Sequence, residues 1–259
     1  MPNAPPTSRG RASSSRAVRS PRARRGVLKA LLLPGIDGGG RLFGPLLAAE
    51  PRGLLPEVVS YPADRVLGYD DLATLVRERL PRGRFLLVAE SFSGPIAIRL
   101  AAERPPGLAA LVLAASFLHR PLNPLLHPIR GLVGARLFGV PMPAAIVRHF
   151  MAGPDAPRAI VAEVQAAVAA VPAEVMAHRA AEALGVDARE DLARVDAPIL
   201  WLAPARDRLV RTDAAEEVLA IRPDAEVATI DAPHMILQRC PHASLAFIEE
   251  LLAPRVEIG

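Results

Sequence analysis

Ser91 stands among small residues at a point where the sequence changes from a strand-like to a helix-like pattern. The stretch AESFSG, residues 89–94, places Ala89 two residues before this serine and Ser93 two residues after it. A serine hydroxyl acts as a nucleophile when it is pushed out on a sharp strand-to-helix turn, and small neighbours let strand and helix approach closely there. A helix start also favours negative charge that develops beside it. The spacing therefore indicates a catalytic nucleophile, with an ordinary helix-capping serine as the alternative.

Short apolar segments alternate with longer amphipathic ones from Val27 onward, and the turn at Ser91 is one step in this series. The predicted strands are 27–33, 56–60, 84–89, 108–115, 198–203 and 225–230. The predicted helices are 41–49, 69–80, 92–104, 212–221 and 241–252. Such alternation is typical of a parallel sheet covered by helices. We therefore expect a doubly wound, mostly parallel α/β sheet in a single domain over residues 27–259.

Residues 117–195 separate the fourth predicted strand from the fifth. This stretch is too long for an ordinary connection, so we expect an insertion with structure of its own. Apolar residues recur at helical spacing in three of its segments, and prolines separate them: 143–152, 157–171 and 172–184. The pattern predicts a helical cap over a pocket, with additional packing as the alternative.

The turn at Ser91 and the order of segments around it resemble the α/β-hydrolase fold superfamily, from Val27 to the end of the chain. Members usually have G-x-S-x-G at this turn, whereas this chain has Ala89 and Ser93 in the glycine positions. Both residues are small, so we expect a turn that is more strained but still formed. The resemblance implies a serine esterase or lipase-like protein with a helical cap and no cofactor.

The loop after the first predicted strand is expected, by this resemblance, to supply half of an oxyanion hole. The sequence PGIDGGG, residues 34–40, occupies the position of the family's His-Gly-x motif. The implied donors are the backbone N–H groups of Ile36, with Asp37 next in line, and of Phe92, which follows the nucleophile. A phosphate-binding loop is the alternative, but the sequence has neither the Gly-x-Gly-x-x-Gly order nor the Gly-Lys-Ser/Thr ending.

The resemblance also implies the base and the acid of a catalytic triad. His234 lies just beyond the last predicted strand, where the family keeps its histidine, and is expected to take the proton of Ser91. Asp207 follows the fifth predicted strand and is expected to orient the imidazole. Asp213 is the nearest rival for the acid, although it stands at a predicted helix start. The chain order Ser, Asp, His is that of this fold.

Other reactive side chains are expected to have structural roles. Glu90 should point away from the Ser91 hydroxyl, Asp231 should bond within its loop, and Trp201 and Cys240 should pack inside. The remaining histidines are expected at the surface or in the insertion: His119, His127, His149, His178 and His242.

Positive charge is concentrated at the start of the chain. Of 259 residues with a net charge of +4, the first 26 hold seven arginines and no acid, so the remainder carries −3. This tail of Arg, Pro and Ser has almost nothing to bury, and we expect it to be disordered. We interpret it as an inert extension or as the result of a start codon assigned too far upstream, with a nucleic-acid or lipid-binding arm and an export signal, suggested by RRGVLK at 24–29, as alternatives.

The remaining composition favours a cytoplasmic protein. A single cysteine excludes an internal disulfide, and no apolar run is long enough for a transmembrane segment. No metal, organic cofactor or nucleic-acid partner is indicated.

The expected function is hydrolysis of a carboxylic ester or thioester of a small apolar substrate, through an acyl-enzyme on Ser91. A serine rather than an aspartate at the turn argues against haloalkane dehalogenase and epoxide hydrolase chemistry. Two alternatives remain open. One is an acyltransferase, because PGIDGGG and ESFSG are similar to motifs of the plant phytyl-ester-forming proteins. The other is a ligand-binding receptor on a hydrolase fold. Acyl chain length and oligomeric state do not follow from these motifs.

Overall fold

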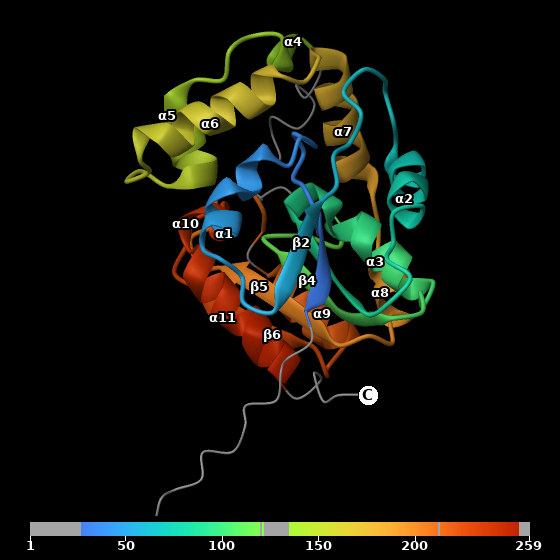
Figure 1. Cartoon of the computed structure of the whole chain (residues 1–259). Helices are drawn as coiled ribbons and strands as arrows, with labels where there is room; N and C mark the ends of the chain where they lie inside the picture. The colour runs from blue at the N-terminus through green and yellow to red at the C-terminus, as the bar shows by residue number, and fades with distance from the viewer. Residues whose placement is uncertain (1–26, 120, 122–134, 212, 254–259) are drawn as a thin grey trace, which may run out of the picture.

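Six parallel strands form the centre of the molecule. The structure is a computed structural model that describes residues 27–119, 121, 135–211 and 213–253 (Figure 1). The tail 1–26, for which we expect disorder, and His127 lie outside these residues. Across the sheet the strand order is β2-β1-β3-β4-β5-β6. The strands are β1 (Leu28–Leu33), β2 (Leu54–Val58), β3 (Phe85–Glu90), β4 (Leu108–Ala114), β5 (Ile199–Pro204) and β6 (Glu226–Ile230).

Helices cover both faces of this sheet, which confirms the predicted doubly wound α/β class. One face carries α2 (Tyr69–Arg77), α3 (Gly94–Ala102), α8 (Arg189–Ala193) and α9 (Ala214–Ile221). The other carries α1 (Gly44–Ala48), α10 (Ile236–Arg239) and α11 (Pro241–Leu252). The five predicted helices outside the insertion are present, whereas α8 and α10, of five and four residues, escaped prediction because they are too short to show a helical period.

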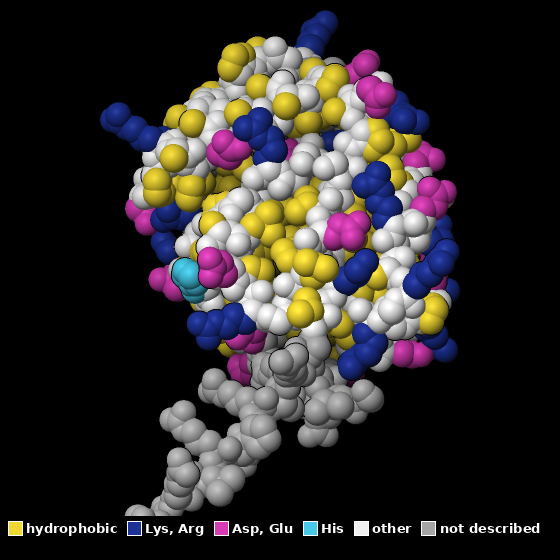
Figure 2. All heavy atoms as spheres, in the orientation of Figure 1, with side chains coloured by type: hydrophobic (Ala, Val, Ile, Leu, Met, Phe, Trp, Pro, Cys, Tyr) yellow, Lys and Arg dark blue, Asp and Glu magenta, His cyan; other side chains and the backbone are white. Residues whose placement is uncertain are grey.

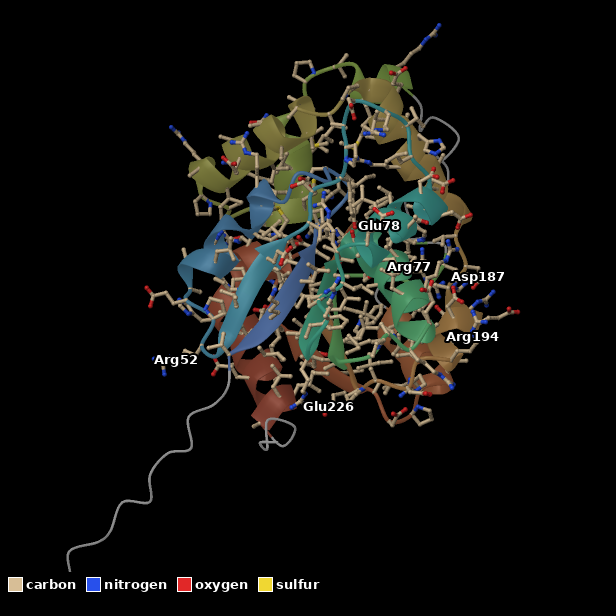
Figure 3. The ribbon with its side chains drawn as sticks, turned by 45° about the vertical axis from the view of Figure 1, so that its right-hand side comes forward. Arg52, Arg77, Glu78, Asp187, Arg194 and Glu226 are labelled. Atoms are coloured by element: carbon tan, nitrogen blue, oxygen red, sulfur yellow. The ribbon has the colours of Figure 1, made fainter. Side chains whose placement is uncertain are left out.

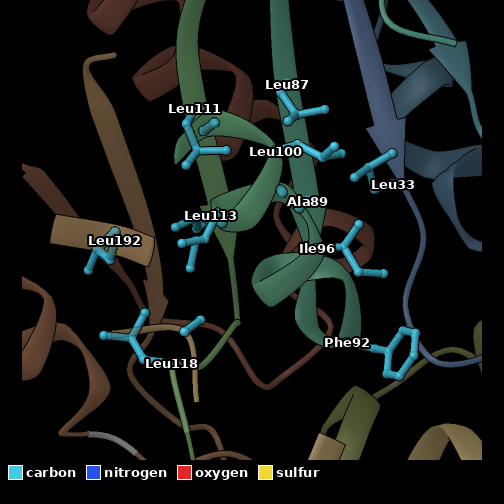
Figure 4. Close-up of a cluster of buried hydrophobic side chains, with 14 of the residues drawn as sticks. Leu33, Leu87, Ala89, Phe92, Ile96, Leu100, Leu111, Leu113, Leu118 and Leu192 are labelled. Carbon is cyan, nitrogen blue, oxygen red and sulfur yellow. The ribbon is translucent and has the colours of Figure 1, made fainter. Parts of the chain in front are cut away.

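Alternate residues of the strands supply two separate cores, because successive side chains point to opposite faces. Leu87 and Leu113 pack under α3 with Ile96 and Leu100, as Figure 4 shows. Leu86 and other residues of the opposite parity pack against α11. The inner strands β1, β3, β4 and β5 are buried on both faces, which explains why they are almost continuously apolar rather than alternating, whereas the edge strands β2 and β6 are partly exposed.

Residues 135–185 form a further group of helices at one end of the sheet (Figure 1). They are α4 (Ala135–Phe138), α5 (Ala144–Ile146), the π-helical segment η4 (Val147–Ala152), α6 (Arg158–Ala169) and α7 (Ala173–Gly185). Pro157 and Pro172 stand directly before α6 and α7, where a proline costs no helical hydrogen bond. The predicted helix 143–152 is divided between α5 and η4.

The insertion leaves and rejoins the sheet at adjacent points. The Ala188 N–H donates to the Leu118 carbonyl oxygen at 2.9 Å, and His119 pairs with Asp187 in an isolated antiparallel bridge. Asp187 is at the surface (Figure 3), where its carboxylate bonds with Arg189, and this hydrogen bond lowers the pKa of Asp187 to about 2. The two connections therefore brace each other at the end of β4.

Within the described residues, no single helix has the length and apolar character needed to cross a membrane. Helices α6 and α7 meet those criteria only as a pair, and the pair is bent by 99°.

Strand β2 forms one edge of the sheet, and apolar side chains gather on the surface around it (Figure 2). Leu55 is 54% exposed. The Leu28 N–H donates to the Gly53 carbonyl oxygen, and the Val59 N–H donates to the Leu32 carbonyl oxygen. The backbone N–H and C=O groups of odd-numbered residues in this segment therefore point toward β1, and the backbone of Pro56 points away from the sheet. Proline offers no N–H to another strand, so this edge is blunted against further pairing.

Candidate active site

Ser91 lies at a sharp turn between β3 and α3. A short 3₁₀ turn of Ser91–Ser93 links the two elements. The φ angle of Ser91 is 48°, in the left-handed region, which costs a non-glycine residue about 1–3 kcal/mol. A tight fit enforces this turn, because a Cβ atom built on Gly94 would lie only 1.7 Å from Ser116 Oγ. Ser116 Oγ in turn donates to the Ser91 carbonyl oxygen at 2.9 Å.

His234 joins Ser91 to Asp207 through hydrogen bonds. Its Nε2 atom lies 3.0 Å from Ser91 Oγ, and its Nδ1 atom lies 2.7 Å from Asp207 Oδ2. The second carboxylate oxygen, Oδ1, accepts from the N–H groups of Leu209 and Val210, each at 2.9 Å. A carboxylate only accepts, so Nδ1 carries the proton and Nε2 is left to accept from the serine hydroxyl. The structure thus brings together three predicted side chains that follow three different strands.

The His234 imidazole is almost fully buried beside two carboxyl groups. Burial lowers its pKa, but the charge and hydrogen bond of Asp207, helped by the charge of Glu90, outweigh that effect. The pKa of His234 is therefore raised above its ordinary value. A general base with such a pKa takes up a proton readily and returns it to a leaving group.

The rival residues lie elsewhere. Asp213 is exposed and forms an ion pair with Arg211 at 2.6 Å. His149 contacts Arg208, and His119 lies 3.0 Å from Glu217. Trp201 is buried as expected, whereas Cys240 is only half-buried. His178 is half-buried and His242 is exposed. Asp231 forms an ion pair with Arg206 at the surface.

The loop after β1 forms a turn around Ile36, whose N–H is one of the two predicted oxyanion donors. The Gly38 N–H donates to the Gly35 carbonyl oxygen at 3.0 Å, which closes a turn around Ile36. No described residue accepts a hydrogen bond from the Ile36 N–H, so this group is available to a ligand. Phe92, the other predicted donor, follows Ser91 in the turn, and its ring stacks on Tyr69 at 4.8 Å.

The hydroxyl group of Ser93 forms hydrogen bonds that a glycine in the same position could not form. Its Oγ, fully buried, donates to the Pro34 carbonyl oxygen and lies 2.6 Å from the Tyr61 hydroxyl. Because Ser93 donates to Pro34, the Tyr61 hydroxyl donates to Ser93. The Tyr61 N–H also donates to Gly38 at 2.8 Å. Ser93 therefore ties the turn at Ser91 to the loop that carries Ile36, a role for which its departure from the glycine pattern was the only signal.

Two further buried side chains, for which the sequence indicated no role, contact this loop. Arg179 of α7 donates to backbone carbonyl groups of the loop, and Asp37 accepts from the Gly39 N–H at 3.0 Å. Burial raises the pKa of the Asp37 carboxyl, against the opposing hydrogen bond of Gly39 and charge of Arg179. The sequence around Arg179 and Asp37 contains no signal that distinguishes them from ordinary helix and loop residues.

Glu90 is buried directly before Ser91 and points to another partner. Its two oxygens accept from Gln238 Nε2 of α10 at 2.9 and 3.1 Å. Burial raises the pKa of Glu90 to about 7, although the Gln238 hydrogen bond and the charge of His234 oppose it. Since this acid is harder to ionise in the folded protein than in the unfolded chain, its contribution to stability is lost as the pH rises from about 4.5 through 7.

Replacing Glu90 by glutamine is expected to stabilise the protein more at high pH than at low pH. Glutamine keeps an acceptor for Gln238 and cannot ionise. The gain in free energy of unfolding should be about 2–3 kcal/mol larger at pH 8 than at pH 5. Urea unfolding at both pH values measures it. Glu78→Gln, at an exposed position at the end of α2 (Figure 3), serves as the control. Equal gains at the two pH values would contradict the burial of an ionisable carboxyl.

Among the described residues, no three His, Cys, Asp or Glu side chains lie close enough together to hold a metal ion.

Solved structures similar to this one share its architecture over most of the chain. No family model matches the sequence, and no curated protein is similar to it. The enol-lactonase from Burkholderia xenovorans LB400 has a TM-score of 0.74 at 14% identity, over 88% of this chain and 92% of that one. A bromoperoxidase from Bacillus anthracis has a TM-score of 0.72 at 16% identity, over 88% and 92%. A hydrolase from Pseudomonas aeruginosa PA01 has a TM-score of 0.67 at 21% identity, over 87% and 89%. At these identities the similarity shows a common fold.

Proposed function

Because the chain has the α/β-hydrolase fold, we propose that it is a serine hydrolase that cleaves a carboxylic ester or thioester through an acyl-enzyme on Ser91. The hydrogen-bonded series from Asp207 through His234 to Ser91 Oγ, at a strained turn, carries this proposal. An ordinary helix-capping serine needs neither a buried histidine nor a buried carboxylate behind it. The two hydrogen bonds are the arrangement in which a serine hydroxyl becomes a nucleophile.

The reaction begins when Ser91 Oγ attacks the carbonyl carbon and its proton passes to His234 Nε2. The C=O electron pair becomes an oxyanion, which the N–H groups of Ile36 and Phe92 bind. As the tetrahedral intermediate collapses, the bond to the leaving oxygen or sulfur breaks, and His234 gives it the proton. Water then attacks the acyl-enzyme, losing its proton to His234, and the carboxylic acid leaves while Ser91 regains its hydrogen. Asp207 stabilises the imidazolium in both halves.

An apolar substrate is supported by the contact between the insertion and the histidine loop. Met235, next to His234, is buried in a cluster with Val147 and Val164 of the insertion. Its N–H donates to the Met151 carbonyl oxygen of η4 at 3.0 Å. Hydrocarbon side chains of the insertion therefore pack against the loop that carries His234, and pockets for apolar ligands are lined by side chains of this kind. In this arrangement the insertion acts as a cap.

The similarity to an enol-lactonase, which is named for a cyclic ester, supports an ester as the bond cleaved. The similar structures also include a bromoperoxidase, so one fold carries several activities. The proposal therefore depends on the arrangement of Ser91, His234 and Asp207.

Hydrolysis of p-nitrophenyl esters of increasing acyl length tests the proposed activity. We expect repeated turnover with the free acid as product, and the same product when a long-chain alcohol is present, because the site needs only water as acceptor. Chromatography of the products distinguishes the acid from a new ester. A new ester as the main product would instead identify an acyltransferase, and a single turnover with tight retention of the ligand would identify a binding protein.

A further inference from the structure

Arg179 is a buried cation that points from the insertion into the loop after β1. It lies on α7, and only 1% of its surface is exposed. Its Nη1 donates to the carbonyl oxygens of Ile36 and Asp37, each at 3.0 Å, and its Nη2 donates to that of Pro62 at 2.9 Å. Three backbone carbonyl groups from two loops therefore converge on one guanidinium.

Burying a guanidinium is costly unless its donors are satisfied and its charge is compensated. Part of the compensation is present, because Asp37 interacts favourably with the charge and the Tyr61 ring lies 5.9 Å from the guanidinium carbon. An apolar residue would dock a helix at lower cost. The arginine is thus better explained by what its hydrogen bonds fix than by packing.

The bonds fix the orientation of the peptide groups around Ile36. The Gly35 carbonyl is held by Gly38, and the Ile36 and Asp37 carbonyls are held by Arg179. Gly38 has a φ of 68°, and a Cβ atom there would lie 2.5 Å from Nη1, so the loop and the guanidinium fit closely. With three successive carbonyls held, the Ile36 N–H has its direction set.

We propose that Arg179 is a positioning residue that orients the Ile36 N–H for the oxyanion and so makes the oxyanion hole depend on the docked insertion helix α7. The inference rests on the proposed function, because it assigns this loop to a tetrahedral intermediate. Binding of the ground-state ester needs no such alignment. Loss of Arg179 therefore reduces kcat and leaves KM nearly unchanged.

A purely structural role for Arg179 predicts something different, and Glu182 provides the comparison. It lies one turn further along α7 and accepts from the Tyr69 N–H at 2.7 Å, so it also fastens the helix to the core. It forms no hydrogen bond with the described loop 34–40. Glu182→Ala loosens α7 without releasing the three carbonyl groups, which makes it the matched control.

The test compares Arg179→Met, Arg179→Lys and Glu182→Ala with the wild type, after melting curves show that each is folded. Arg179→Met should lower kcat by about 100- to 1,000-fold, as loss of one oxyanion donor does, with KM within about threefold. A trifluoromethyl ketone, which forms a tetrahedral adduct, should bind more weakly by a similar factor. Arg179→Lys keeps the positive charge but not the planar guanidinium, so its kcat should lie between those of Arg179→Met and the wild type. The kcat of Glu182→Ala should stay within about threefold of the wild-type value.

Amide hydrogen exchange over residues 34–40 gives a readout that does not depend on activity. Exchange there should accelerate in Arg179→Met and remain unchanged in Glu182→Ala. Unchanged exchange in a folded Arg179→Met, or equal losses of kcat in Glu182→Ala and Arg179→Met, would overturn the inference. If the wild type shows no Ser91-dependent turnover, the proposed function fails by itself, and the exchange measurement still decides whether Arg179 positions the loop.

Discussion

Ser91→Ala is expected to remove ester turnover and labelling by a fluorophosphonate probe, with kcat lower by about 10⁴- to 10⁶-fold. The variant has no Oγ to attack the carbonyl carbon, while His234, Asp207 and the Ile36 N–H remain in place. The fold should be retained, because Ser116 bonds to the backbone carbonyl of residue 91 and not to its side chain. Steady-state kinetics and gel detection of the labelled protein measure both effects.

Ser244→Ala is the matched control for this loss. Ser244 is fully buried in α11, and its hydroxyl has no hydrogen-bond partner among the described residues. Its variant should label and turn over like the wild type. Labelling that survives in Ser91→Ala would mean that the probe reacts at another residue and would refute Ser91 as the activated nucleophile.

Asp207→Asn is expected to lower kcat by about 10⁴-fold while leaving the fold intact. The N–H groups of Leu209 and Val210 both point to one oxygen of residue 207, so an asparagine will place its carbonyl oxygen there. Its NH₂ group then faces His234 Nδ1, which must accept. The proton moves to Nε2, and the imidazole can no longer accept from Ser91.

The pH profile distinguishes this variant from one that is merely unstable. The base works when neutral, so wild-type kcat/KM should fall as the pH drops through a His234 pKa above the ordinary value of about 6.5. Without the Asp207 charge, burial dominates and lowers that pKa, so the acidic limb of the residual activity should move to lower pH. Profiles from pH 5 to 9 measure the shift.

Asp213→Asn is the control for that profile, because Asp213 is exposed and paired with Arg211. It should leave both the rate and the acidic limb unchanged. An unmoved limb in Asp207→Asn would contradict the assignment of Asp207 as the partner of His234, and a loss of rate in Asp213→Asn would restore the rival assignment.

The parts of the fold that local sequence determines were predictable. The inner strands β1, β3, β4 and β5 are buried on both faces, so their apolar runs stand out against the amphipathic helices. Ser91, Asp207 and His234 each follow a strand, and parallel strands bring such positions to one edge of the sheet. Their proximity was therefore expected from the order of elements and the resemblance together.

The support around the site was not predictable, because it depends on contacts between distant segments. Arg179 is 143 positions from Ile36 along the chain, and Ser93 is 59 positions from Pro34. In a helix of the insertion, an arginine that will be buried looks the same as one that faces water. The π-helical segment η4 was also missed, since its apolar spacing reads as an ordinary helix until Gly153, with a φ of 88°, ends it.

The paired connections at Leu118 and Ala188 have a consequence for how proteins with this architecture diversify. Because the two ends of the insertion share a hydrogen bond, a recombination event could replace everything between them without disturbing the sheet. The replacement would change the helices beside the proposed active site, while Ser91, His234 and Asp207 stayed behind. It would also remove Arg179. A chimera with a foreign insertion is thus expected to keep a folded scaffold and to gain a new specificity. Its insertion would need a hydrogen-bond donor in place of Arg179 for the three backbone carbonyl groups before selection could favour it.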